Sequence, residues 1–356
     1  MGNALLINPF GIGDVLFTTP LAHALKESFP GSRVGYLVNS RSACVLKDNP
    51  YVDSLFIYDR DEFEKLRRSS TLEWARKVLL LLRSIRKEHY SLSLDFSLNT
   101  QYGFLSWLAG IKERAGFDYK NRGVFLTRKI ALSGFAGTHM VEQYAGLLRM
   151  FGIEPRYRKP EVYVSGPAQH KADVLLEGLG ITEGDLLIGI LPGGGRSWGK
   201  DARIKQWSPE RFSQLADAII DKFTAKIIIM GDSDEVTLAE KVKAHMRHKA
   251  FDCAGKTSVA ELAALIKRMR LVVCNDGGPL HIAVGLGVKT VSLFGPVDDA
   301  VYGPYPPSGM HIVMKSRVPC RPCYRNFRLS RECRQESDCL QEIGVEDVFR
   351  HVMKLL

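Results

Sequence analysis

Two glycine-rich turns, each directly behind an apolar run, constrain this chain more than any other feature. Residues 3–8 precede Gly11-Ile12-Gly13-Asp14, and residues 186–191 precede Pro192-Gly193-Gly194-Gly195. Glycines between a strand and a helix allow a ligand to approach the backbone, and the first N–H groups of the helix attract an anion. The repetition predicts two nucleotide-binding lobes that face one cleft.

Strand and helix patterns alternate in both halves of the chain. The expected strands are the two runs above and residues 34–38, 55–58, 92–96, 227–230, 271–274 and 290–294. The expected helices lie at 15–28, 71–87, 209–222, 235–247 and 258–268. This is the βαβ order of parallel sheets, so the sequence predicts an α/β chain whose second half repeats the plan of the first.

The join between the halves is expected near residues 153–182, where prolines, glycines and a charged stretch interrupt the periodicity. A chain of 356 residues exceeds the usual size of one core, which also favours two domains. We therefore expect a first Rossmann-like domain at 1–165, a second at 166–340, and a C-terminal helix at 341–356 that packs back on the lobes.

The net charge of +10 attracts phosphate-bearing partners of several kinds. Nucleic acid is disfavoured among them, because the basic residues are dispersed and aromatic residues do not alternate with them. The apolar start ends at Pro9 and no run is long enough to span a membrane, so the sequence predicts a cytoplasmic protein. Residues 76–87 form a basic amphipathic stretch that either lies on an anionic membrane surface or packs its leucines on a sheet.

The first turn departs from a dinucleotide-binding fingerprint. Leu16 stands where the third glycine is required, which disfavours an NAD site. Asp14 lies at the start of the helix that we expect to run through Leu25, where the helix dipole favours an ionised carboxylate. An ionised carboxylate is what a general base requires. The alternative role for Asp14 is to cap the helix.

The second turn approaches a P-loop at residues 194–200, but Asp201 replaces the hydroxyl residue that would bind Mg²⁺, so ATP hydrolysis is excluded. What remains is a flexible loop with four cations beside a glycine turn, which suits a diphosphate neutralised without metal. These cations are Arg196, Lys200, Arg203 and Lys205. The alternative is a solvated basic surface.

Two further polar segments follow strands of the second half. Asp232-Ser233-Asp234 either holds a metal or enters a helix, and Glu235 beside it lies where acids of nucleotide folds bind ribose hydroxyls. Asp276-Gly277-Gly278-Pro279 opens a helix with proline in its first turn, which makes it the best phosphate site in the chain. Asp276 is expected to hold a hydroxyl or to orient the turn, and His281 either reaches the ligand or is structural.

The cysteines divide into two groups. Three are scattered and are expected in the core as small apolar residues: Cys44, Cys253 and Cys274. The others form a C-terminal cluster: Cys320, Cys323, Cys333 and Cys339. A structural metal, disulfides and free thiols are all compatible with this cluster, since only its first pair has the close Cys-x-x-Cys spacing.

Six motifs follow one another along the chain: Gly11-Ile12-Gly13-Asp14 with Thr18-Thr19-Pro20, His139-Met140-Val141-Glu142-Gln143-Tyr144, Pro192-Gly193-Gly194-Gly195, Lys205-Gln206-Trp207, Asp276-Gly277-Gly278-Pro279-Leu280-His281 and Phe294-Gly295-Pro296. In this order they resemble glycosyltransferase family 9, the ADP-heptose:lipopolysaccharide heptosyltransferases. No single motif is specific, but their order is. The resemblance extends from the first strand to the cysteine-bearing tail.

The resemblance implies a GT-B fold whose N-terminal lobe binds the acceptor and whose C-terminal lobe binds the nucleotide sugar. It implies an inverting transfer of heptose from ADP-heptose to a lipopolysaccharide-core or other lipid-linked glycan, by direct displacement without a metal or other cofactor. Such an enzyme works in the cytoplasm or peripherally on the inner face of the plasma membrane.

Under this resemblance Asp14 is the base that accepts the proton of the acceptor hydroxyl. Lys205 stabilises the leaving diphosphate, with Arg196 and Lys200 as helpers. The acceptor side includes Gly11, Gly13 and Thr18. The other donor-side residues are Gly193, Gly194, Gly195, Glu235, Asp276, Gly277, Gly278 and His281.

The chain departs from the family near the donor. Arg196-Ser197-Trp198 stands where members commonly carry Thr or Ser pairs, and Gly278 stands where many have a small hydroxyl or a hydrophobic residue. These differences leave the transferred sugar open. Two other functions of a two-lobed fold are alternatives: a nucleotide-sugar epimerase, which would convert the donor without an acceptor, and a non-enzymatic nucleotide-sugar-binding module.

Overall fold

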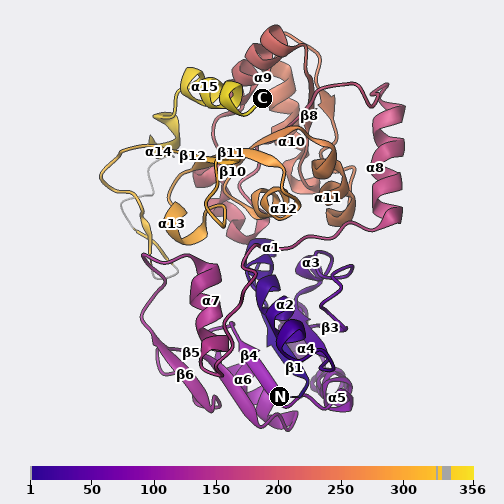
Figure 1. The fold of residues 1–356 in the computed structure, drawn as a ribbon, viewed down its shortest axis with the longest axis vertical. Coiled ribbons are helices and arrows are strands. Elements are labelled where there is room, and N and C mark those ends of the chain that lie inside the picture. The colour runs from indigo at the N-terminus through magenta and orange to yellow at the C-terminus, as the bar shows by residue number, and fades with distance from the viewer. Residues whose placement is uncertain (1, 326–327, 331–337) are drawn as a thin grey trace. The chain divides into compact units, whose positions relative to one another are not determined.

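The computed structural model describes residues 2–325, 328–330 and 338–356, except for the side chains of Arg196, Ser197, Lys200 and Asp338. The chain divides into two compact units, Met1–Glu161 and Val162–Leu356, and both are α/β (Figure 1). The division falls inside the stretch at 153–182 where the sequence loses its periodicity. Within the described residues each unit contains one parallel six-stranded sheet, which confirms the predicted fold class.

The first sheet has the order β3-β2-β1-β4-β5-β6, so the chain starts in the middle, moves to one edge and returns to the other side. Its strands are β1 (Ala4–Ile7), β2 (Val34–Val38), β3 (Ser54–Ile57), β4 (Leu92–Asp95), β5 (Glu113–Tyr119) and β6 (Arg128–Leu132). Its helices are α1 (Ile12–Leu16), α2 (Thr19–Ser28), α3 (Ser40–Ala43), α4 (Arg60–Ser69), α5 (Thr71–Lys87), α6 (Thr100–Leu108) and α7 (Met140–Arg149). The order reverses between β1 and β4, and open α/β sheets bind ligands at the carboxyl ends of such a strand pair.

The second sheet has the order β12-β11-β10-β7-β8-β9, which is the same topology with β7 in the place of β1 and β10 in the place of β4. Its strands are β7 (Leu187–Leu191), β8 (Lys226–Ile229), β9 (Phe251–Asp252), β10 (Leu271–Asn275), β11 (Lys289–Phe294) and β12 (His311–Lys315). A short antiparallel pair, β13 (Tyr324–Arg325) and β14 (Arg328–Leu329), lies apart from it.

The helices of the second unit follow the strands in the same alternating order. The α-helices are α8 (Gly166–Gly178), α9 (Pro209–Phe223), α10 (Val236–His245), α11 (Val259–Arg268), α12 (Gly278–Leu286), α13 (Asp299–Tyr302), α14 (Asp338–Gln341) and α15 (Val345–Leu355). Two 3₁₀ helices join them, η1 (Arg196–Lys205) and η2 (Ser233–Glu235).

The predicted strands are confirmed, and the additional ones lacked a clear pattern. β6 is an edge strand with exposed charged residues, and β9 has two residues, so neither produces a hydrophobic period. The single helix expected at 15–28 is wrong, because the structure forms α1 and α2 with a break at Thr18. The Thr18 hydroxyl donates to the Val15 carbonyl at 2.7 Å across this break, and Pro20 occupies the first turn of α2, where its missing N–H costs little.

Helices α5 and α6 cover one face of the first sheet. Leu82 and Ile85 of α5 join Tyr102 and Leu105 of α6 in one core with residues of β1, β2 and β3. The sequence left open whether residues 76–87 pack on the sheet, and the inner side of α5 does so. Across the described ranges, no helix combines the length and the hydrophobicity that crossing a bilayer requires.

The C-terminal helix α15 belongs to the second unit. It lies beside α9, as the yellow helix in Figure 1 shows, and Val348 and Val352 enter the core that surrounds Trp207. The indole N–H of Trp207 donates to the Ile343 carbonyl at 3.1 Å. The C-terminal helix thus packs on the second unit, and Trp207 of the Lys-Gln-Trp motif is a structural anchor for the segment before it.

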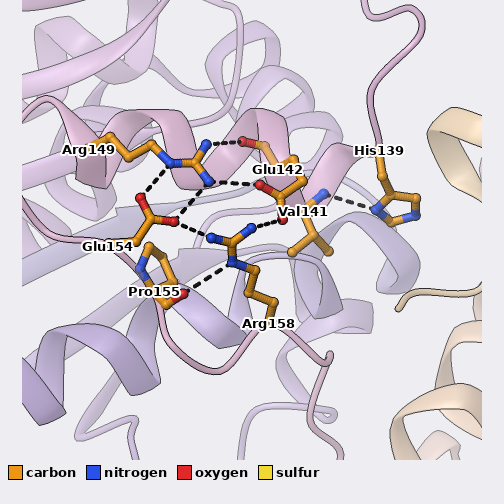
Figure 2. A network of polar contacts seen from close by, with 7 residues as sticks. All are labelled: His139, Val141, Glu142, Arg149, Glu154, Pro155 and Arg158. Carbon is orange, nitrogen blue, oxygen red and sulfur yellow. Dashed lines mark hydrogen bonds and ion pairs between the residues drawn. The ribbon is translucent and has the colours of Figure 1, made fainter. Parts of the chain in front are cut away.

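Polar contacts fix the end of the first unit to helix α7 (Figure 2). Glu142 of α7 accepts hydrogen bonds from Arg149 at 2.7 Å and from Arg158 at 2.6 Å. Glu154 accepts from both arginines as well. His139 caps the same helix. The motif that begins at His139 therefore stabilises the exit from the first unit.

Candidate active site

The second unit packs its glycine turn tightly against two other segments. A Cβ atom on Gly193 would lie 1.7 Å from Oε1 of Glu235, and one on Gly194 would lie 2.2 Å from the carbonyl oxygen of Ala202. Gly195 has a φ angle of 83°, in the left-handed region that favours glycine. Local geometry therefore requires glycine at positions 194 and 195, and Gly193 leaves room for the Glu235 carboxylate against the turn.

Glu235 lies across this turn. Its Oε2 accepts a hydrogen bond from the Asp232 N–H at 3.1 Å. Burial, and then the nearby Asp232 carboxylate, raise the pKa of Glu235. Asp232 caps η2 by accepting from the Asp234 N–H at 2.8 Å, so the helix-entry interpretation of these acids is confirmed.

Lys205 and Asp276 form a buried ion pair. Lys205 Nζ lies 2.6 Å from Asp276 Oδ2, and the two side chains are only 6% and 7% exposed. The Lys205 ammonium also lies 4.7 Å from the centroid of the Trp198 ring. Asp276 was expected to hold a hydroxyl or orient the turn; in the structure its carboxylate neutralises the lysine, so its charge is balanced at the site.

The turn after β10 brings backbone N–H groups to the same place. A Cβ atom on Gly277 would lie 3.9 Å from the Cα of Gly195, so the two glycine turns of this unit are neighbours. Gly278 and Pro279 begin α12, and in the described part of the chain no acceptor is found for the N–H groups of Gly277 and Gly278. His281 is buried one turn further along α12. The arrangement offers an anion donors from a helix start.

Asn275 holds these turns together, although the sequence predicted no role for it. Its Nδ2 donates to the carbonyls of Pro192, at 2.7 Å, and Gly193, at 3.2 Å. Its Oδ1 accepts from the Trp207 N–H at 3.1 Å. An asparagine at the end of an apolar strand, directly before the Asp-Gly-Gly turn, was the sequence signal that could have indicated this role.

The loop expected to be flexible is η1, a 3₁₀ helix interrupted at Gly199. The φ of 53° at Gly199 permits the kink. Of the cations predicted there, Lys205 is buried and Arg203 is exposed. The side chains of Arg196 and Lys200 lie outside the described part of the chain.

The first unit presents Asp14 at its own glycine turn. Gly11 occupies the N-cap of α1 with extended backbone, and Asp14 is the third residue of that helix and is half-buried. The suggestion that Asp14 is the capping residue is therefore wrong. Gly13 accepts a backbone hydrogen bond from Phe17. Thr18 is fully buried, so it stabilises the break after α1 and is not open to an acceptor.

Side chains from neighbouring strands fix the turn that carries Asp14. Asn8, at the end of β1, donates to the Asp14 carbonyl at 2.9 Å. Asn39, after β2, donates to the carbonyls of Pro9 at 3.0 Å and Phe10 at 2.6 Å. None of these amides was predicted, because their partners come from other strands. They place Asp14 in a defined position.

A polar cavity of about 410 Å³ lies beside this turn in the first unit. Its wall is formed by residues that follow the carboxyl ends of β1, β2, β3 and β4: Pro9, Phe10, Asn39, Arg41, Tyr58, Asp59, Arg60, Asp61, Ser97, Asn99, Gln101 and Tyr102. This is the end of the sheet where ligands bind in open α/β folds. Two arginines and two aspartates line the cavity together, so its polar wall suits a polyhydroxylated ligand.

Asp95 is buried at the end of β4, opposite Ile7 of β1. Its Oδ1 accepts a hydrogen bond from the Ser97 N–H at 2.8 Å. Burial raises the pKa of Asp95 to about 6, against the opposing effect of this hydrogen bond. The fold thus disfavours the ionised form of Asp95, which lies next to the cavity residue Ser97.

The cysteine prediction divides. Cys253 and Cys274 are buried as expected, but Cys44 is only half-buried. Cys320 is exposed, whereas Cys323 and Cys339 are buried in the second unit. Cys333 lies outside the described residues. No group of three potential metal ligands occurs within the described ranges.

The sequence profile of glycosyltransferase family 9 (heptosyltransferase) matches residues 78–331. The chain belongs to this family. The predicted resemblance is confirmed, and the protein is a glycosyltransferase of the heptosyltransferase type. Lipopolysaccharide heptosyltransferase 3 of Escherichia coli K12 is 24% identical over 350 residues, which cover 97% of this chain and 95% of that protein.

Solved structures agree on the fold. A glycosyltransferase family 9 protein from Veillonella parvula superposes with a TM-score of 0.83 at 23% identity, covering 99% of this chain and 97% of its own. The E. coli ADP-heptose lipopolysaccharide heptosyltransferase II superposes with a TM-score of 0.76 at 19% identity, covering 99% and 98%. Both support the GT-B fold class predicted from the sequence.

Proposed function

We propose that this enzyme transfers heptose from ADP-heptose to a lipopolysaccharide-core or other lipid-linked glycan, with inversion at the anomeric carbon and without a metal. The named relatives support the donor and the acceptor class. The observation that carries the proposal is the donor-type arrangement of the second unit. There, a buried Lys205–Asp276 pair and the start of α12 meet the glycine turn.

In this proposal the diphosphate of the donor lies on the N–H groups of Gly277 and Gly278, which a helix start makes favourable for an anion. Lys205 stabilises the charge that develops as ADP leaves, and Asp276 keeps the lysine in position. Arg196 and Lys200 are further proposed cations. They help to neutralise the charge of the departing diphosphate.

The ribose and the sugar are assigned to the neighbouring residues. Glu235, held by the Asp232 N–H, accepts hydrogen bonds from the ribose hydroxyls. The backbones of Gly193, Gly194 and Gly195 allow the nucleotide to approach, and His281 frames the sugar.

The chemistry is a single displacement. The acceptor hydroxyl oxygen forms a bond to the anomeric carbon, the bond from that carbon to the diphosphate oxygen breaks, and ADP leaves with the electron pair. Asp14 takes the hydroxyl proton. A carboxylate is a much weaker base than an alkoxide, so the proton transfers late, after bond formation has acidified the hydroxyl.

The acceptor is assigned to the first unit. The cavity beside the turn of Gly11 and Gly13 that carries Asp14 is lined by both arginines and aspartates, and these polar groups suit the hydroxyls of a glycan acceptor. Because the proposed acceptor is lipid-linked, we also propose that the enzyme works in the cytoplasm and binds peripherally to the inner face of the plasma membrane.

Thermal unfolding with ADP, UDP, GDP and CMP tests the donor assignment. A nucleotide at about 100 times its dissociation constant stabilises the native state by about 2.7 kcal/mol. ADP is expected to be the stabilising nucleotide. Stabilisation by UDP or GDP alone would overturn the ADP-heptose assignment, and NMR of ADP-heptose with the enzyme but no acceptor would expose an epimerase by conversion of the donor.

A further inference from the structure

The outer side of helix α5 carries exposed leucines. Leu82 and Ile85 pack on the first sheet, whereas Leu72, Leu79 and Leu80 point away from it. Leu72 is 82% exposed and Leu80 is 51% exposed. Their spacing places the three leucines on one side of the helix. A helix that only covers a sheet would present polar residues there.

Exposed cations share the outer side of α5 with these leucines. Arg76, Arg83 and Lys87 are exposed on α5, and in the described part of the chain no carboxylate lies within ion-pair distance of them. Lys77, by contrast, pairs with Glu62 at 2.5 Å. The outer side of α5 therefore combines apolar surface with positive charges that form no ion pair within the described ranges.

Helix α6 adds aromatic rings to the same face of the unit. Both helices pack on one side of the first sheet through one core, so their outer sides face the same way. Phe104 and Trp107 stack with ring centroids 5.7 Å apart, and Trp107 is 50% exposed. Phe125 contacts both rings, and the neighbouring Val124 is exposed.

The concentration of apolar surface on this face is specific to it. The exposed large apolar side chains of α5, α6 and the β5–β6 connection are Leu72, Leu79, Leu80, Phe104, Trp107 and Val124. Among the described residues of the whole second unit, only Val174, Met310 and Met353 are comparable, and they lie on separate elements. Contiguous exposed apolar surface marks an interaction site.

We infer that the outer sides of α5 and α6, together with Val124, form the surface by which this enzyme docks on an anionic lipid bilayer. Leucine and tryptophan side chains enter the interfacial layer, and the basic side chains remain at the lipid phosphates. Charge complementarity selects this occupant, since the cations lie among the exposed leucines and, within the described ranges, have no carboxylate at ion-pair distance. The inference rests on the proposed function only in that a lipid-linked acceptor requires such a surface.

Vesicle sedimentation of the full chain tests the surface. The probes are vesicles of phosphatidylcholine alone and of phosphatidylcholine with about one quarter phosphatidylglycerol. Arg76→Gln with Arg83→Gln is expected to weaken binding to the anionic vesicles roughly 30-fold, because each basic residue near such a surface contributes about a factor of five. Leu79→Ser with Leu80→Ser is expected to weaken it roughly tenfold, since half-exposed leucines gain part of a full burial.

Matched changes on the second unit serve as controls. Lys222→Gln with Lys241→Gln removes the same charge, and Met310→Ser removes an exposed apolar side chain; both variants are expected to bind vesicles as the wild type does. Brominated lipid is expected to quench tryptophan emission on binding, and Trp107→Phe is expected to remove most of that quenching. Unchanged thermal unfolding shows that each variant is folded.

Equal vesicle binding by the wild type and both double variants of α5 would overturn the inference. A wild type that dimerises without lipid, together with monomeric α5 variants, would overturn it as well and assign the face to a second copy. ADP stabilisation is measured on the same samples. A wild type that binds vesicles but is not stabilised by ADP contradicts the proposed function and leaves the docking surface supported.

Discussion

The turn after β1 and the turn after β7 occupy equivalent places in two sheets of the same topology. The first leads directly into α1 and presents an acid, Asp14, in the third position of that helix. The second leads into the 3₁₀ helix η1, and the next long helix begins only at Pro209. The first turn thus offers a carboxylate at a helix start, whereas the second leaves space beside it for N–H groups and a buried cation.

The neighbouring strands β4 and β10 also differ, in the residue at their carboxyl ends. β4 ends in Asp95, a buried acid that bonds to its own loop, and β10 ends in Asn275, an amide that bonds to the neighbouring turn. An amide both donates and accepts, so Asn275 can tie carbonyls to an N–H. One fold therefore gives two different turns: the first presents a carboxylate at a helix start, and the second presents backbone N–H groups beside a buried lysine.

Asp14→Asn should produce the largest effect, because it removes the proposed proton acceptor while preserving the size of the side chain. We expect kcat to fall by about 10³-fold, within the range that general-base catalysis contributes. ADP stabilisation should be unchanged, since the donor is assigned to the other unit. The rate is measured as ADP release from ADP-heptose in the presence of acceptor, and Asp48→Asn is the control. Substantial turnover by Asp14→Asn would show that Asp14 is not the catalytic base.

Lys205→Met should leave the buried Asp276 carboxylate without its cation. We expect a loss of about 3–5 kcal/mol in the free energy of unfolding, measured by urea denaturation. Adding Asp276→Asn removes the stranded charge and should recover most of that loss, while ADP affinity should stay weak in both variants. If the double variant regains ADP affinity by calorimetry, Lys205 serves only the fold.

Asp95→Asn gives the first sheet an amide at the position where the second has one. In the wild type, the Asp95 carboxyl loses its proton near pH 4 in the unfolded chain but only near pH 6 in the folded chain. The contribution of Asp95 to the free energy of unfolding is therefore fully present below about pH 4 and is lost as pH rises through about 6. A pKa change from 3.8 to about 6 corresponds to about 3 kcal/mol. In the variant, the free energy of unfolding from urea denaturation should not fall between those pH values. The same fall in the variant as in the wild type would mean that the pKa of Asp95 is not raised in the folded chain.

Gly193→Ala should have the smallest effect of these changes. Its Cβ meets the Glu235 carboxylate, a side-chain end that shifts, so we expect a loss of about 1–3 kcal/mol in thermal stability and weaker ADP binding. Gly178→Ala, at a position with open space, is the matched control and should not weaken either property. If Gly193→Ala binds ADP as tightly as the wild type does, Glu235 does not take part in donor binding.

Much of the fold was predictable because its signals are local. The runs that became β7, β8 and β10 are continuous and apolar, as buried parallel strands require, and α9 and α11 have strong amphipathic periods. The break between α1 and α2 was missed, because the leucines continue on both sides of it and the first helix is closed by hydrogen bonds of the Thr18 hydroxyl and N–H to the Val15 carbonyl. The 3₁₀ form of η1 was missed because its polar residues have no apolar period.

The sequence by itself determined the two glycine turns, the strands before them, and the presence of an acid at the first and cations near the second, since each depends on residues close together in the chain. Only the tertiary structure decided what those residues touch. Lys205 meets Asp276, and Asn275 meets Pro192, because β7 and β10 are neighbours in a parallel sheet whose pairing joins distant segments. Spacing along a chain specifies a period, but a buried charge acquires its partner from the strand that packs beside it.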